Sequence, residues 1–334
     1  MAKLAGVSHM TVSNALNKTG RMSEKTRKKI LEIIRGLDYY PSEAAKILAK
    51  GGKDVIAFVS SRLASPFISV ILSSIEDRAV ETEKYVYGIE HYSTRGMEKG
   101  GSDLLNGLLF SKKVSAVILL SIQPGEDVVK KYRDKGVPLV LLESKIKGAH
   151  CVHSNNISGA CSAVEHLIKR GRKRIGIITG KQIISEKEEM MPTTLERMEG
   201  YMSALRSNGI DFEPGFVEEA DDYTTDDGAM ALDNFLAKKI NLDAIFCPAG
   251  DAAAMGVMSR AKELGIRIPQ DMALIGYDDA PASKLLSPAL TTVRQPLDKM
   301  ARAAFDLAIE GMAGGLTEDK VIEFDQELIV REST

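Results

Sequence analysis

Short polar side chains lie on one face of a predicted helix near the N-terminus. In LAGVSHMTVSNALN, residues 4–17, a glycine allows a tight corner and Ser8 can accept a hydrogen bond from a backbone N–H of the helix that follows. Val12, Ala15 and Leu16 lie at i, i+3 and i+4 and predict the buried face of this helix. The outward positions are short or soft and uncharged: His9, Met10, Ser13, Asn14 and Asn17. Because Asn can pair bidentately with adenine, His can donate or accept, and Met can contact a thymine methyl group, the pattern indicates a helix-turn-helix that reads base edges. An ordinary helical corner is the alternative.

A third helix and the charge distribution support DNA binding. The helix is predicted at residues 23–37, SEKTRKKILEIIRGL, where Ser23 can cap the first turn and one apolar stripe is kept by Ile30, Ile33, Ile34 and Leu37. Residues 1–53 carry eleven Lys or Arg and four Asp or Glu, a formal charge of +7, whereas the rest of the chain carries −9. A basic head can neutralise phosphates and release counterions, whereas an acidic body is repelled by DNA. We therefore favour a DNA-binding head over a merely solvated charged face.

The two segments AKLAGVSHMTVSNALN and SEKTRKKILEIIRGLDYYPSEAAKILA resemble the head of the lactose-repressor (LacI/GalR) family of bacterial transcription regulators, and the resemblance continues through the whole chain. It implies that His9, Met10 and Asn14 read bases and that Thr11 and Ser13 hold phosphates. The base-reading positions vary within the family, so the resemblance does not give the operator sequence. Relatives normally begin several residues earlier. We therefore expect either a misplaced start codon or a clipped first helix, and a clipped helix would lose apolar and phosphate contacts and weaken DNA binding.

Residues 42–53 are predicted to form a hinge helix and linker. Pro41 cannot continue the third helix, Ser42 can cap a new helix of barely two turns, and Gly51-Gly52 ends it. Because so short a helix is marginal in water, we expect it to fold only when something holds it.

The resemblance gives this hinge helix a role at the DNA. It implies that the helix pairs with its copy from a second subunit, that Ala45 allows close approach, and that Leu48 wedges into the minor groove. A plain linker with Leu48 packed on the body is the alternative. The full set expected at the DNA is Ser8, His9, Met10, Thr11, Ser13, Asn14, Ala45 and Leu48.

From Asp54 onward, short apolar runs alternate with amphipathic stretches, which predicts parallel strands flanked by helices. The expected strands are VIAFVS, YVYGIEH, VSAVILLS, VPLVLL, RIGIITG, FVEEA, DAIFCPA and MALIGYDD. About 280 residues exceed one comfortable core, so these strands divide four and four into two lobes. The expected fold class is α/β: a helix-turn-helix head at residues 1–41 and, at residues 54–334, a two-lobed effector-binding and dimerisation domain with two parallel sheets, similar to periplasmic sugar-binding proteins. Lobe 1 is expected at about 54–155 and 294–320 and lobe 2 at about 156–291 and 321–334, with crossovers near Asn155-Asn156, Thr291–Arg294 and Lys320–Ile322.

Ligands of such folds bind beyond the carboxyl ends of the strands. The loops there carry the candidate effector-binding residues: Ser65, Phe67, Glu143, Arg197, Tyr223, Asp251, Asp278 and Gln295. Carboxylates that accept from two hydroxyl groups, a guanidinium that donates in a fork and an aromatic ring that covers an apolar face suit a sugar. Each residue has a structural alternative: Arg197 can pair with a neighbouring glutamate, Asp278 can cap a turn, and Tyr223 can pack between lobes. The resemblance matches Arg197 and Asp278 best to family ligand positions, while Gly250 replaces an Asn of many relatives and removes one side-chain bond to the ligand.

Other classes of site find little support. The three cysteines, Cys151, Cys161 and Cys247, suit neither a metal cluster nor a disulfide scaffold. The sequence contains no apolar run of eighteen residues, signal segment, phosphate-cradling glycine motif or nucleophile–base pair. We therefore expect no metal, no cofactor, no enzymatic activity and no membrane association, and we expect a cytoplasmic location.

The sequence as a whole predicts an allosteric repressor. We expect a homodimer on a two-fold symmetric operator, controlled by a small molecule between the lobes, with a carbohydrate as the expected effector and induction as the expected sign. One alternative keeps the DNA role with a purine or a protein coregulator as effector. A stand-alone solute-binding module or an enzyme of similar architecture is the alternative from another class.

Overall fold

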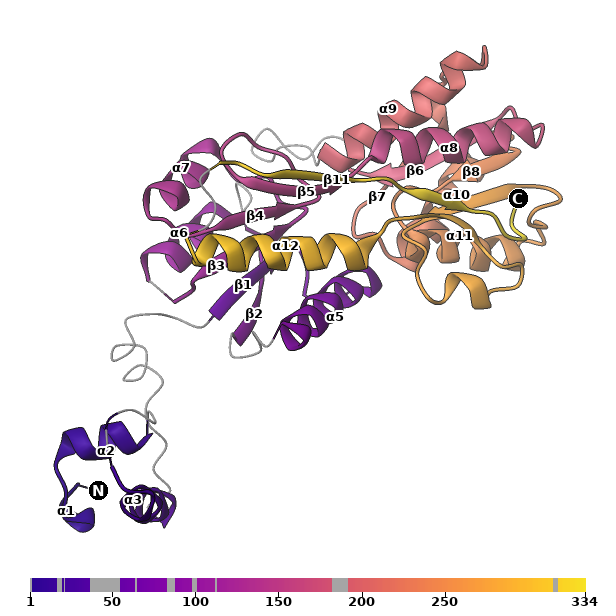
Figure 1. The fold of residues 1–334 in the computed structure, drawn as a ribbon. Coiled ribbons are helices and arrows are strands. Elements are labelled where there is room, and N and C mark those ends of the chain that lie inside the picture. Colours follow the sequence, from indigo (N-terminus) through magenta and orange to yellow (C-terminus); the bar gives the residue numbers. More distant parts are fainter. Residues whose placement is uncertain are drawn as a thin grey trace. The chain divides into compact units, whose positions relative to one another are not determined.

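The computed structural model describes residues 2–16, 20, 22–36, 55–63, 65–82, 88–97, 101–111, 113–181, 192–314 and 318–334. The chain divides into two compact units, Met1–Lys53 and Asp54–Thr334 (Figure 1). The expected hinge helix, with Ala45 and Leu48, lies outside the described residues, as do Asn17 and Leu37. Among the described residues, no helix is both long enough and apolar enough to span a bilayer.

In the described part of the first unit there are three short helices, α1 (Ala2–Ala5), α2 (His9–Leu16) and α3 (Glu24–Gly36). Gly6 turns the corner between α1 and α2 with φ +68°, a conformation that glycine adopts without strain. The predicted caps are confirmed, because Ser8 Oγ accepts from Thr11 N at 3.1 Å and Ser23 Oγ accepts from Thr26 N at 3.1 Å. A small apolar core joins the helices: Ala2, Ala5, Val12, Ala15, Ile30 and Ile34.

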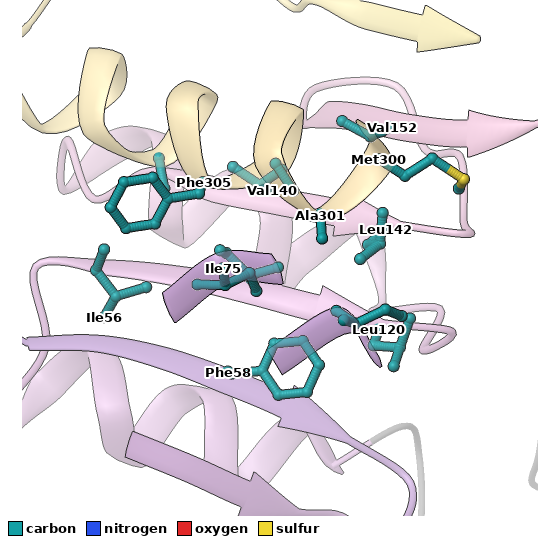
Figure 2. Close-up of a cluster of buried hydrophobic side chains, with 14 of the residues drawn as sticks. Ile56, Phe58, Ile75, Leu120, Val140, Leu142, Val152, Met300, Ala301 and Phe305 are labelled. Carbon is teal, nitrogen blue, oxygen red and sulfur yellow. The ribbon is translucent and has the colours of Figure 1, made fainter. Parts of the chain in front are cut away.

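In the second unit, the first lobe is a six-stranded parallel sheet with the order β11-β5-β4-β3-β1-β2. Its strands are β1 (Val55–Ser60), β2 (Gly88–Ser93), β3 (Ala116–Leu120), β4 (Leu139–Leu142), β5 (His150–Ser154) and β11 (Val321–Phe324). Helices α5 (Pro66–Glu81) and α12 (Leu297–Met312) cover one face, and α6 (Ser102–Phe110) and α7 (Glu126–Asp134) cover the other. Figure 2 shows Met300 and Phe305 of α12 packed over strand side chains such as Ile56 and Val140. The apolar runs therefore lie in strands buried on both faces, as parallel sheets require.

The second lobe is a six-stranded sheet with the order β12-β10-β9-β8-β6-β7, in which only β12 runs antiparallel to its neighbour. Its strands are β6 (Ile175–Gly180), β7 (Val217–Ala220), β8 (Ala244–Phe246), β9 (Ala273–Tyr277), β10 (Thr291–Arg294) and β12 (Glu327–Ile329). Helices α8 (Asn156–Lys169) and α9 (Pro192–Ser207) cover one face, and α10 (Thr225–Ala237) and α11 (Asp251–Glu263) cover the other. Short 3-10 turns lie at Pro214–Phe216 and Ser283–Leu285. The predicted α/β class with two lobes is confirmed.

The division of the strands between the lobes differs from the expectation at three places. The strand β5 was not expected, because its two histidines interrupt the apolar run, yet four of its five residues are buried. The segment Thr291–Arg294, expected as a crossover, is β10 of the second sheet, where it pairs with β9. Strand β11 pairs with β5, so the first lobe extends to Phe324 rather than to residue 320, and the chain recrosses at Asp325-Gln326. Its alternating, half-exposed residues did not show to which sheet the strand belongs.

Candidate effector cavity and DNA-reading helix

The predicted outward face of α2 is partly open to solvent. His9 is exposed, Met10 is 74% exposed, and Thr11 Oγ1 lies 2.9 Å from the capping Ser8 Oγ. Asn14 is half-buried against Gly20, where a Cβ would lie only 2.7 Å from Asn14 Nδ2. The head thus presents His9 and Met10 freely, whereas Asn14 also packs on its own turn. The side chain of Ser13 lies outside the described residues.

A cavity of about 720 Å³ lies in the second unit, at the carboxyl ends of strands from both sheets. Loops after β1 and β3 line it from the first lobe, and loops after β7, β8 and β9 line it from the second. Because parallel strands end at one edge of a sheet, this edge brings together side chains from distant parts of the sequence. Seven of the eight predicted effector residues line the cavity: Ser65, Phe67, Arg197, Tyr223, Asp251, Asp278 and Gln295.

Arg197 of α9 is the cation that the cavity holds most firmly. Its Nε donates to Asn156 Oδ1 at 2.9 Å, its Nη1 donates to the Pro248 carbonyl at 2.9 Å, and its Cζ lies 4.0 Å from the centroid of the Tyr277 ring. Burial lowers the pKa of Arg197, but the neighbouring Tyr277, Asp278 and Glu143 outweigh burial and raise the pKa overall. The guanidinium is therefore fixed and charged, with Nη2 free of any close hydrogen bond among the described residues.

Asp278, which follows β9, supplies a carboxylate to the same cavity. Its Oδ1 accepts from Gln295 Nε2 at 2.6 Å. Its Oδ2 lies 3.0 Å from where a Cβ on Gly250 would stand, and Gly250 has φ +112°. Burial raises the pKa of Asp278, and Arg197 and Gln295 oppose that shift. Glycine at position 250 therefore leaves the Oδ2 side of this carboxylate unobstructed.

Asp251 lines the cavity, but its own fold uses its oxygen atoms. Oδ2 accepts from Ala280 N at 2.7 Å and from Ser283 Oγ at 2.5 Å, and Oδ1 accepts from Thr292 Oγ1 at 2.7 Å. The residue is 1% exposed. Asp251 therefore joins α11 to the loop after β9 and to β10. This structural role is additional to the ligand contact that the sequence predicts for it.

Glu143 does not line the cavity, in contrast to the expectation. The residue follows β4 with φ +61° and is 2% exposed. Its Oε1 accepts from Ser154 N and lies 2.9 Å from Ser154 Oγ, and its Oε2 lies 3.9 Å from Arg197 Nη2. Burial raises the pKa of Glu143, and the Arg197 charge opposes that shift. Glu143 supports the guanidinium from behind instead of facing the cavity.

The remaining predicted residues combine lining and structural roles. Ser65 caps α5 by accepting from Ile68 N at 3.1 Å, and Phe67 packs partly against the core of the first lobe. Tyr223, with φ +59°, is 39% exposed, and its hydroxyl lies where a Cβ on Gly180 would clash with it. Two aromatic side chains, a carboxylate and a guanidinium therefore line one cavity.

Comparison with known proteins gives the family. The model of bacterial regulatory proteins of the lacI family matches residues 1–42, and that of the periplasmic binding protein-like domain matches residues 164–334. The transcriptional repressor PurR of Pasteurella multocida is 30% identical over 338 residues, covering 100% of this chain and 97% of that protein. The transcriptional regulator CelR of Thermobifida fusca is 30% identical over 342 residues, covering 100% of this chain and 96% of that protein. The chain belongs to the lacI family.

Solved structures agree with this assignment. A CelR–cellobiose complex is 28% identical with a TM-score of 0.73, covering 100% of this chain and 98% of that chain. A lac repressor dimer bound to operator and the anti-inducer ONPF shares the fold, with 24% identity, a TM-score of 0.82 and coverage of 100% and 97%. This lacI-family chain is a DNA-binding transcription regulator with a periplasmic-binding-protein-like body.

Sequence reasoning missed several residues of the cavity. Ser121 and Asp279 were not predicted. They belong, with the predicted Tyr223 and Asp278, to a group of non-glycine lining residues with positive φ, between 51° and 96°. Such conformations cost energy and concentrate at functional sites, but no sequence pattern reveals them. Charged residues at the mouth were also missed: Arg62, Asp222, Arg294, Asp298, Lys299, Asp325 and Glu327. Their positions after strands and at crossovers were the available signal.

Ion pairs join the two lobes at Asp222, which lines this cavity. Arg62 Nη1 lies 2.5 Å from Asp222 Oδ1, and Arg95 Nη2 lies 3.1 Å from Asp222 Oδ2. Both arginines belong to the first lobe and Asp222 belongs to the second. Because all three side chains are partly exposed, we expect these pairs to contribute modestly and to be screened by salt.

The substitution Asp222→Asn is expected to weaken effector binding about fivefold, because it removes the charge that draws the lobes together over the ligand. Titration calorimetry at low and at high salt measures the effect, which should shrink at high salt. Asp221→Asn is the matched control, since Asp221 pairs at 3.1 Å with Lys181 of its own lobe. Equal losses in both variants would contradict an interlobe role for Asp222.

The substitution Ser8→Ala is expected to destabilise the head by about 1 kcal/mol, because it removes the cap of α2. Operator affinity should fall with it, since α2 carries the base-reading residues. Ser23→Ala removes the equivalent cap of α3 and should cost similar stability with a smaller loss of operator affinity. Circular dichroism melting and fluorescence anisotropy on operator DNA separate the two effects.

Proposed function

We propose that the chain is a homodimeric repressor whose operator affinity is lowered by a neutral carbohydrate bound between the lobes. The observation that carries this proposal is that a fixed guanidinium, Arg197, and the Asp278 carboxylate line one cavity that Tyr223 and Phe67 also line. A fork of N–H donors, a carboxylate acceptor and aromatic faces match the hydroxyl groups and apolar ring face of a sugar. The cellobiose complex of CelR supports the same ligand class.

The charge of the lining favours a neutral ligand. Among the lining residues that the structure describes, acidic side chains outnumber basic ones: Asp222, Asp251, Asp278, Asp279, Asp298, Asp325 and Glu327 against Arg62, Arg197, Arg294 and Lys299. An effector with a phosphate group would meet net repulsion. A volume of about 720 Å³ falls within the range of sites that enclose a drug-sized ligand, so it has room for more than one sugar ring.

The assignment as a repressor, and not an enzyme, follows from the same features. Among the described residues that line the cavity there is no histidine or cysteine, and the buried carboxylates there are held by hydrogen bonds or by Arg197. The described residues contain no group of three metal-ligating side chains. We infer a regulator that acts on the chromosome in the cytoplasm, with two heads on a two-fold symmetric operator.

A thermal-shift screen tests the effector. We expect a neutral sugar, with cellobiose as the first probe, to raise the melting temperature, and we expect the phosphorylated sugar and purine bases to leave it unchanged. Stabilisation by a purine base alone would overturn the carbohydrate proposal.

Selection of operator sequences from a random DNA library tests the output. The selected sites should be two-fold symmetric, and Asn14→Ala should change the footprint at the positions that α2 contacts. The sugar found in the screen should weaken binding to the selected operator. Unchanged base preference in Asn14→Ala would contradict base reading by that residue.

A further inference from the structure

Buried polar side chains connect the three crossovers between the lobes. Ser154 ends β5 and Asn156 begins α8 at the first crossover, Gln295 lies on the second, and Gln326 lies on the third. Ser154, Asn156 and Gln295 are almost fully buried, with 1%, 1% and 3% of their surface exposed. Polar groups in such places are costly unless they bond to one another, so their partners define a specific arrangement.

Ser154 and Gln326 form the centre of this cluster. Gln326 Nε2 donates to Ser154 Oγ at 2.7 Å and lies 3.3 Å from Asn156 Oδ1. Ser154 Oγ also lies 3.1 Å from Gln295 Oε1. One glutamine thus connects the third crossover to the first directly. It reaches the second through the Ser154 hydroxyl, whose single hydrogen Gln295 Oε1 shares with Glu143 Oε1 at 2.9 Å.

The same glutamine contacts two of the residues that hold the cavity's guanidinium. Tyr277 donates its hydroxyl hydrogen to Gln326 Oε1, and the Tyr277 ring lies under Arg197. Asn156 Oδ1, which Gln326 reaches, accepts from Arg197 Nε. A single residue, either Tyr277 or Asn156, therefore separates Gln326 from Arg197 in the cavity.

The opposite ligand group joins the cluster through the second crossover. Gln295 Nε2 donates to Asp278 Oδ1 at 2.6 Å, and Gln295 Oε1 faces Ser154. Arg197 and Asp278, the cation and the anion of the cavity, are thus both connected to all three crossovers.

A glycine inside α8 provides separate support. A Cβ on Gly159 would lie 1.8 Å from Gln326 Oε1 and 3.2 Å from Gln326 Cβ. Glycine within a helix is destabilising relative to alanine, so a glycine at this position indicates that a Cβ cannot be accommodated there. Gly159 makes the space in which Gln326 reaches Tyr277 and Asn156.

We propose that Gln326 is a positioning residue for effector binding: it holds Asn156 and Tyr277 under Arg197 and links the occupied cavity to the three crossovers. The inference rests on the proposed effector role of the cavity. Since a change of lobe closure must bend these crossovers, a ligand that pulls on Arg197 and Asp278 acts directly on the residues that set their geometry.

Hydrogen–deuterium exchange of the full chain, without ligand, tests the positioning. Gln326→Leu and Gly159→Ala remove Gln326 from its contacts in different ways. In both variants we expect exchange to accelerate about tenfold in peptides around residues 150–158 and 293–300, which are far from residue 326 in sequence. Gln123→Leu is the control, because Gln123 is also half-buried and bonds to the Lys145 carbonyl, away from the crossovers. Acceleration confined to residues 321–329, or spread equally over the core strands β1 and β3, would overturn the proposal.

Titration calorimetry with cellobiose separates this inference from the proposed function. If cellobiose binds the wild-type protein, Gln326→Leu should weaken it at least tenfold and Gln123→Leu should not. Equal affinity in wild type and Gln326→Leu would overturn the role of Gln326 and leave the sugar proposal intact. Coupled exchange at the crossovers, with no sugar bound by the wild type, would instead overturn the sugar proposal and retain Gln326 as the residue that positions the cavity.

Discussion

Arg197→Lys is expected to weaken effector binding about 100-fold or more while operator binding in the absence of effector stays within about twofold. Arg197 reaches Asn156 and the Pro248 carbonyl from two different nitrogens and still lies over Tyr277. A lysine ammonium is a point donor on a flexible chain and cannot keep this fork. A side chain that no longer faces the ligand in this orientation loses up to two charge-assisted hydrogen bonds to it, which corresponds to roughly 3 kcal/mol of binding free energy.

The measurement is titration calorimetry with the best sugar of the thermal-shift screen, together with anisotropy on the selected operator. Arg260→Lys is the matched control, because Arg260 pairs with Asp233 and Glu263 on the surface of the second lobe, outside the cavity. The expected phenotype is a repressor that still binds its operator but no longer responds to the sugar. Wild-type sugar affinity in Arg197→Lys would show that the guanidinium serves the fold and not the ligand.

The sequence predicts the fold well where burial is two-sided and poorly at the edges of the lobes. Continuous apolar runs such as residues 116–120 and 139–142 identify strands of a covered parallel sheet. Strand β5 was not predicted because His150 and His153 interrupt its apolar run, although His153 is only 3% exposed in the fold. Strand β11 was assigned to the wrong lobe because a short alternating segment can join either sheet. Its pairing partner, which is distant in the sequence, decides which one.

For the site, too, the sequence predicts what depends on local position and not what depends on partners distant in the chain. Asp278 could be predicted because ligand residues of this fold class lie after strands. Arg197 lies in the second turn of α9 rather than at the start of a helix, and it could be predicted only from the family resemblance. The supporting role of Glu143 and the hydrogen bonds that occupy Asp251 could not, since both depend on partners 11 to 54 residues away in the chain. The Arg62–Asp222 pair joins residues 160 positions apart, and nothing local distinguishes either from an ordinary surface charge.

Asp251→Ala is expected to lower the free energy of unfolding of the second unit by about 3 kcal/mol or more. The change leaves three donors without their acceptor: the buried Ser283 Oγ and Thr292 Oγ1, and the partly buried Ala280 N. Each unsatisfied buried donor costs about 1–3 kcal/mol, reduced where water enters. Urea unfolding of the full chain measures the loss. Asp233→Ala, which removes a half-exposed surface pair with Arg260, should change stability by less than about 0.5 kcal/mol.

Asp251→Asn distinguishes the charge of this residue from its hydrogen bonds. Burial and the neighbouring Asp278 raise the pKa of Asp251 from 3.8 to about 7. Because the folded state then binds a proton more tightly than the unfolded state, the stability from that proton is fully present below about pH 4 and is lost as the pH rises to 7. Asparagine cannot titrate, so the stability difference between wild type and Asp251→Asn should shrink over the same interval. Other groups titrate alike in both proteins and cancel, so a difference that stays constant from pH 4 to pH 7.5 would show that Asp251 is already ionised throughout and acts only as an acceptor.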